Sequence, residues 1–115
     1  MALKEKALKR LTEKLNAAGV VWGVYGDFVR AQRGEDVAWH GFELMTGPDQ
    51  LAAADKVLTR LGMRHEEAGG IAYHFDGADV LLTVSDTFTA ADLDGTITVL
   101  GVAVPVLRGT GEEKA

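Results

Sequence analysis

The segment at residues 47–62, GPDQLAAADKVLTRLG, constrains the fold more than any other part of the sequence, because it carries helix signals at both ends. Pro48 stands in the first turn, where a helix needs no backbone N–H, and Gly62 stands where helices commonly stop. Between them, apolar side chains recur at three- and four-residue spacing: Leu51, Ala54, Leu58 and Leu61. This pattern predicts an amphipathic helix that buries one face against another layer.

A second amphipathic helix is predicted at residues 3–18, ended by Gly19. Its apolar stripe consists of Leu3, Ala7, Leu8, Leu11, Leu15 and Ala18. Lysine and arginine residues lie between these positions, but Glu5 and Glu13 are interspersed with them. The mixture indicates a solvated helix face rather than an anion-binding surface.

The chain after this helix predicts a strand and a short helix. Residues 19–26, GVVWGVYG, are β-branched and aromatic and are bounded by glycines, which is typical of a buried strand. Residues 27–34, DFVRAQRG, predict a short helix that Asp27 caps and Gly34 stops.

Residues 37–46, VAWHGFELMT, predict the second strand. Because strand residues alternate between two faces, Gly41 and Glu43 share one face, and His40 points to the other. A metal-binding strand end would carry two acidic residues on one face, whereas this strand carries one.

The sequence after the 47–62 helix predicts two more hairpin elements. Residues 63–86 read as strands that are interrupted at Gly69-Gly70. They turn again at Asp76-Gly77, a dipeptide favoured in tight antiparallel hairpins.

Residues 87–95 predict a weak short helix or a loop, and residues 96–107 predict a final hairpin that turns near Gly101. The order of elements is helix, strand, helix, strand, helix, two strands, weak helix, two strands. It predicts an α+β fold with a mixed β-sheet and helices packed against it. We expect one domain over residues 1–108 and a flexible tail over residues 109–115.

Composition limits the function. The chain has 115 residues and a net charge of -5, so it carries no excess positive charge for nucleic acid. It has no cysteine, which removes disulfides and thiol chemistry. No apolar run approaches the roughly 20 residues that a membrane helix needs, and no signal peptide is evident. We therefore expect a cytoplasmic protein with no nucleic-acid or membrane partner.

Three stretches resemble the small nucleotidyltransferase-like proteins, a superfamily of minimal nucleotidyltransferases and their antitoxin relatives. They are LNAAGVVWGVYGDFV, WHGFELMTGPDQLAAADKVLTRLGM, and DGADVLLTVSD followed by LGVAVPVL. The similarity covers roughly residues 8–107 and implies a nucleotidyltransferase-like mixed sheet.

The resemblance also implies a site. In that family a glycine-containing pair after the first strand binds nucleotide phosphates, and it corresponds here to Gly26 and Asp27. Two aspartates at the end of the next strand hold Mg²⁺ or Mn²⁺, and they correspond to Gly41 and Glu43. A third carboxylate on a neighbouring strand corresponds to Asp79. Such a set binds the metal ions that bridge the phosphates of a nucleoside triphosphate.

This sequence departs from the family pattern at two of these positions. Gly41 has no side chain to bind a metal, and the Asp27 carboxylate competes with a phosphate for the helix N–H groups, which favours a capping role. His74 and Asp76 share a strand face from which they could reach Glu43, although histidine suits zinc or manganese better than magnesium. We therefore expect weak metal and nucleotide binding or none.

Three functions follow from the resemblance. The first is a catalytically degenerate domain that binds a protein partner or a nucleotide. The second is an active transferase that uses Glu43 and Asp79 to transfer a nucleotide to a small molecule or a protein hydroxyl. The third is an antitoxin-like interaction subunit or a homodimer. The missing ligand favours a protein that is not an enzyme.

Overall fold

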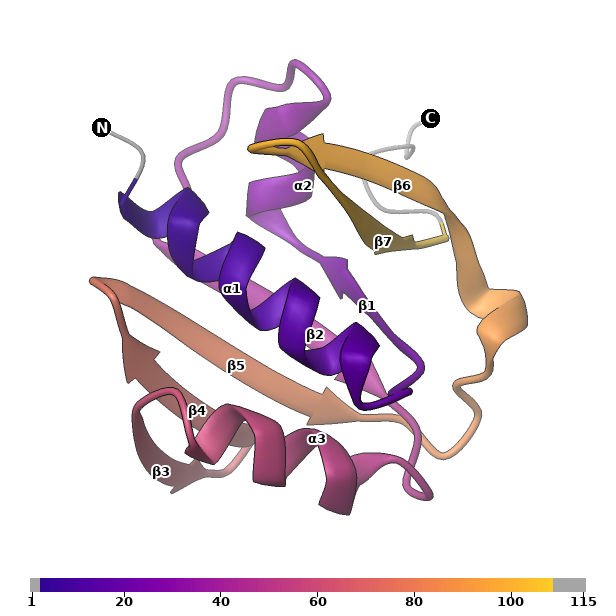
Figure 1. The fold of residues 1–115 in the computed structure, drawn as a ribbon. Coiled ribbons are helices and arrows are strands. Elements are labelled where there is room, and N and C mark those ends of the chain that lie inside the picture. Colours follow the sequence, from indigo (N-terminus) through magenta and orange to yellow (C-terminus); the bar gives the residue numbers. More distant parts are fainter. Residues whose placement is uncertain (1–2, 109–115) are drawn as a thin grey trace.

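A computed structural model describes residues 3–108 (Figure 1); the tail predicted at 109–115 lies outside the described residues. The described elements, in chain order, are α1 (Leu3–Ala17), β1 (Trp22–Tyr25), α2 (Asp27–Gln32), β2 (Gly41–Thr46), α3 (Leu51–Thr59), β3 (Met63–Glu67), β4 (Gly70–Phe75), β5 (Ala78–Val84), the 3₁₀ turn η1 (Ala90–Asp92), β6 (Leu93–Val99) and β7 (Val102–Leu107). Among these residues, no helix combines the length and the apolar character needed to cross a bilayer.

The described strands form one seven-stranded sheet in the order β3-β4-β5-β2-β1-β7-β6. The β2–β5 and β1–β7 pairs are parallel, and the other neighbouring pairs are antiparallel. The predicted mixed α+β sheet is therefore confirmed. The two parallel pairs place β2 and β1 in the middle of the sheet, with the hairpins on either side of them.

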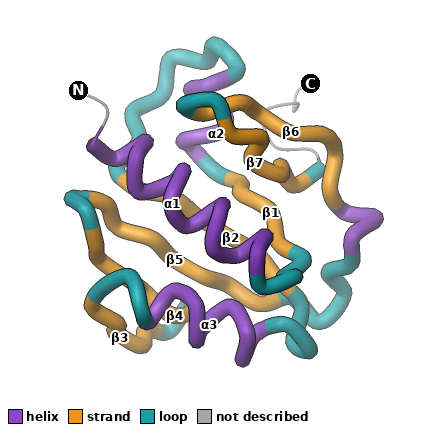
Figure 2. Tube along the Cα trace, in the orientation of Figure 1, coloured by secondary structure: helices purple, strands orange, loops and turns teal. Residues whose placement is uncertain are grey.

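The hydrophobic core lies between the sheet and its helices. In Figures 1 and 2, α1 runs alongside the central strands, in front of β2 and between β5 and β1, and α3 lies beside it in front of β4. The helices and the covered strand face contribute fully buried side chains to this core, including Leu8, Leu11, Leu15, Leu58, Phe42, Leu44, Val80 and Leu82. Because strand residues alternate, the neighbours of the buried strand residues point to the opposite face, which α1 and α3 do not cover.

Local turn chemistry joins β4 to β5 as the sequence predicts. Asp76 and Gly77 both have positive φ angles, 53° and 77°. This combination belongs to the tight hairpin turns that match the twist of the flanking strands. Asp76 also pairs with Arg10 of α1 at 3.1 Å, so its side chain turns toward the helices rather than toward Glu43.

The predicted strand at 37–46 is too long by four residues, since β2 begins only at Gly41. The preceding residues are irregular because Trp39 leaves the sheet and packs on aromatic rings. Its ring centroid lies 4.7 Å from that of Phe28 in α2 and 5.5 Å from that of Phe42. These contacts fix the return of the chain from α2 into β2.

A network of polar side chains ties the β3–β4 hairpin to α3. Asp55 of α3 accepts two hydrogen bonds from Arg64, at 2.8 and 3.2 Å, and one from the hydroxyl of buried Tyr73 at 2.7 Å. The Arg64 guanidinium, with the hydroxyls of Tyr73 and Thr59, lowers the pKa of Asp55 below its usual value. The charged form of Asp55 is thus the form that stabilises the hairpin.

Replacing Asp55 with asparagine should lower the free energy of unfolding by about 2 kcal/mol at neutral pH, because the hydrogen bonds to a charged acceptor are lost. The folded-state pKa is depressed, so this stabilisation is present above the unfolded-state pKa and is lost as pH falls through the folded-state value. The difference between wild type and Asp55→Asn should therefore shrink below about pH 4 in urea titrations. Asp94→Asn, at an exposed position on β6, is the control; an equal loss in both variants would contradict the network.

Candidate functional site

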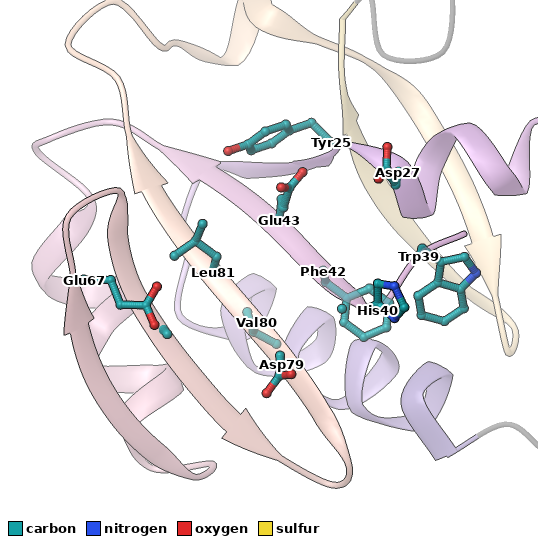
Figure 3. Close-up of a pocket in the computed structure, with 12 residues that line it drawn as sticks. Tyr25, Asp27, Trp39, His40, Phe42, Glu43, Glu67, Asp79, Val80 and Leu81 are labelled. Carbon is teal, nitrogen blue, oxygen red and sulfur yellow. The ribbon is translucent and has the colours of Figure 1, made fainter. Parts of the chain in front are cut away.

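A cleft of about 500 Å³ lies on the face of the sheet that α1 and α3 leave open (Figure 3). Its walls come from the end of β1, the start of α2, the segment just before β2, strands β2, β4 and β5, and the end of β3. Four carboxylates are among its lining residues: Asp27, Glu43, Glu67 and Asp79. The resemblance assigns five positions to phosphate and metal binding, and all of them except Gly26 line this cleft.

Strand pairing explains why Glu43 and Asp79 share this face. In the parallel β2–β5 ladder Gly41 lies opposite Asp79, and Glu43 lies opposite Leu81. Residues opposite each other point to the same side of a sheet, and alternation keeps Glu43 on the side of Gly41. The predicted common face is therefore present, with the two carboxylates on diagonal positions.

The backbones of β2 and β5 approach each other closely at Gly41. A Cβ atom at this position would overlap the backbone oxygen of Asp79 and lie 3.0 Å from its carbonyl carbon. Both obstacles are backbone atoms, which cannot turn aside as a flexible side chain can. Gly41 therefore has no side chain, and the structure around it leaves no room for one.

The Glu43 carboxylate turns away from Asp79 toward the end of β1. Its Oε1 occupies the space that a Cβ atom on Gly26 would fill, and Figure 3 shows it between Tyr25 and Asp27. Burial raises the pKa of Glu43, and the nearby charge of Asp27 raises it further. The carboxylate therefore has an unfavourable environment for its charged form.

The Asp79 carboxylate binds a different neighbour. Its Oδ1 lies 2.7 Å from Nδ1 of His74, which is directly opposite on β4. Both side chains are largely exposed. His74 does approach this site from the next strand, as the sequence suggested, but it meets Asp79 rather than Glu43.

The start of α2 differs from the expectation in one respect. Gly26, with φ 89°, is the N-cap residue, and Asp27 is the first residue of the helix. No side-chain capping hydrogen bond is present there, so the predicted cap role of Asp27 is wrong. The Asp27 carboxylate is exposed and lies 3.9 Å from Arg30 one turn later.

These residues do not fit the metal set that the resemblance implies. Within residues 3–108, no group of three or more His, Cys, Asp or Glu side chains is placed to hold a metal ion. Glu43 and Asp79 diverge, and Gly41 contributes nothing between them. The described residues therefore support no reaction step that uses a bound metal ion.

Sequence reasoning missed several residues of the cleft. His40 lines it together with Glu43, although alternation predicted the opposite face; the reason is that His40 precedes the strand, where alternation does not apply. Tyr25 and Trp39 are partly exposed and line the cleft as well. The Tyr25 hydroxyl lies 3.1 Å from Thr83 Oγ1 on β5 and so crosses over β2.

Comparisons with known proteins identify the fold. No model of a known protein family matches the chain, and no curated protein matches it in sequence. A solved Thermotoga maritima protein, provisionally assigned as a nucleotidyltransferase, matches with a TM-score of 0.72 and 16% identity over 89% of this chain and 75% of its own. ANT(2″)-Ia, solved in complex with adenylyl-2″-tobramycin, matches with a TM-score of 0.69 and 9% identity over 90% of this chain and 68% of its own. The chain therefore has the nucleotidyltransferase-like fold, as the resemblance predicted.

Substituting Gly41 with alanine should destabilise the domain by about 1–3 kcal/mol, because the added methyl group forces the β2 and β5 backbones apart. Gly69→Ala is the matched control, since a Cβ atom there meets nothing within 4 Å. Urea denaturation should leave the control within about 0.5 kcal/mol of wild type. Equal stability of Gly41→Ala and wild type would show that the strands separate freely at this point.

Replacing Glu43 with glutamine should stabilise the domain at neutral pH by up to about 1 kcal/mol. The substitution removes a negative charge from a partly buried position next to the negative charge of Asp27. The folded-state pKa of Glu43 is raised, so its contribution to stability is fully present below the unfolded-state pKa and is lost as pH rises through the folded-state value. The gain in Glu43→Gln should therefore vanish below about pH 4. Glu67→Gln, at an exposed position of the same cleft, should show no such gain; a gain that persisted in acid would refute the assigned cause.

Proposed function

We propose that this nucleotidyltransferase-fold domain has lost nucleotidyl transfer and acts by binding a protein partner through its acidic cleft. The observation that carries the proposal is the contact at Gly41, where the Asp79 backbone occupies the space of a metal-ligand side chain. If only the ligand side chain were missing, a single substitution at position 41 could restore it. Because the Asp79 backbone fills the space of that side chain, β2 and β5 would also have to move apart.

The charge of the cleft favours a protein over a nucleotide. Its lining includes four carboxylates, and none of the described lining residues is lysine or arginine. Without a metal ion, the phosphates of a nucleotide would meet only negative charge, whereas lysine or arginine side chains of a partner would be attracted. Tyr25, Trp39 and Leu81 add an apolar surface on which the stems of such side chains can pack.

Calorimetric titration of the full chain with ATP and GTP, with and without Mn²⁺, is the direct test. We expect no metal-dependent binding and no release of pyrophosphate, and we expect Asp79→Ala to behave as wild type. Metal-dependent binding that disappears in Asp79→Ala would overturn the proposal, because it would mean that the two remaining carboxylates still hold a nucleotide. Activity in that assay would support the alternative of a working transferase.

Recovery of the partner tests the other half of the proposal. The tagged chain should retain a basic protein from its native host, and Glu43→Lys/Glu67→Lys should lose it, while Asp94→Lys on β6 retains it. Retention should weaken with salt because exposed charges are screened. The resemblance favours a helical toxin as this partner, which would make the domain antitoxin-like. Equal recovery by the cleft variant would exclude the cleft as the binding surface.

A further inference from the structure

Strand β3 forms one edge of the sheet and has all five residues exposed. Met63 at its start is 76% exposed, the largest value among the exposed large hydrophobic residues. Every second residue of an edge strand turns its backbone N–H and C=O groups away from the sheet, which offers a template for another strand. The sequence of this edge, MRHEE, shows which strand would fit it.

We infer that β3 pairs antiparallel with β3 of a second copy of this chain, centred on His65, so that two sheets join into one. This interaction does not depend on whether the cleft binds a protein or a nucleotide. A two-fold axis perpendicular to the sheet at His65 reverses the strand direction and keeps each face on its own side. Residue 63 then lies opposite residue 67, and residue 64 opposite residue 66.

Charge selects this register. On the face that carries α3, Arg64 would lie opposite Glu66 of the partner subunit, and Glu66 opposite the partner's Arg64. Moving the centre by one residue would set either Arg64 or Glu66 opposite its own copy, which is unfavourable for like charges. Placing the two-fold axis between two residues would set a residue that points to one face of the sheet opposite a residue that points to the other face. Directly opposite residues of paired strands point to the same face, so this register is excluded.

The residues at this edge are already held in position. Arg64 is fixed by its two hydrogen bonds to Asp55, and its Nη1 donates to Glu66 Oε2 at 3.0 Å. The Glu66 side chain is still 73% exposed, so it has room for a second cation. A guanidinium fixed in this way loses little side-chain entropy when it meets another carboxylate.

The same register brings the second copy to the cleft. Glu67 lines the cleft, and its opposite residue would be Met63 of the partner subunit. The exposed thioether side chain of Met63 would pack on the Glu67 stem and extend the apolar part of the cleft wall. The two clefts would open on the same side of the joined sheet.

The strand is short, so the association should be weak. Five residues a side bury less than the roughly 1,000 Å² that is typical of a stable interface. Sedimentation velocity should therefore show dimers that form as the concentration rises from micromolar to millimolar. Glu66→Arg should weaken this association about tenfold by setting arginines opposite each other, whereas Glu67→Arg, opposite Met63, should change it much less.

Cysteine cross-linking tests the register, and the chain has no cysteine of its own to interfere. In the inferred dimer two copies of residue 65 are about 5 Å apart, within reach of a disulfide, whereas two copies of residue 67 are about 14 Å apart. His65→Cys should therefore form a covalent dimer on mild oxidation, and Glu67→Cys alone should not. A mixture of Met63→Cys and Glu67→Cys should give the mixed dimer.

Thr98→Cys, at an exposed position on the opposite edge strand β6, measures random collision. Cross-linking of His65→Cys no faster than Thr98→Cys would overturn the proposal. A monomer at every concentration would overturn it as well. Efficient cross-linking of Glu67→Cys with itself would show that another register or another surface is used.

Discussion

The packing of α1 and α3 on a single face of the sheet is the constraint on which the rest of the structure depends. It decides which residue of each alternating pair enters the core. Phe42 and Leu44 are buried, whereas Glu43 between them is left on the open face. The site is therefore a consequence of the core, because the same alternation that buries the aromatic and aliphatic residues presents the carboxylates to solvent.

The parallel pairing of β2 with β5 determines what this open face can do. It brings Glu43 and Asp79 to neighbouring strands, as in a metal-dependent transferase, and it also presses the Asp79 backbone against Gly41. Each carboxylate then takes a separate environment: Glu43 lies beside Gly26 and Asp27, and Asp79 binds His74. The chain thus combines the nucleotidyltransferase-like fold with two carboxylates that have separate neighbours.

The Asp55–Arg64–Tyr73 network gives the sheet a rigid edge. It fixes β3 to α3 although β3 has no residue in the core. An edge strand with so little burial would fray if it were held by its ladder alone. Holding it in place presents its charges in a defined order, and the pairing with a second copy that we infer rests on that order.

The sequence by itself determined the elements and their class. The apolar stripe that predicts α3, the Asp76-Gly77 turn and the alternation around Glu43 are local patterns, and each was confirmed because neighbouring residues alone fix it. The bounds of the helix were predicted too wide: α3 runs from Leu51 to Thr59, so Pro48 and Gly62 lie outside it. The irregular segment before β2, the position of His40 and the lack of a cap at Asp27 depend on contacts with residues that are remote in sequence. The separation of the Glu43 and Asp79 carboxylates and the close approach of the Asp79 backbone to Gly41 also depend on such remote contacts. Tertiary structure decided these features because side-chain direction and backbone separation depend on which strands and helices meet, and periodicity carries no information about that.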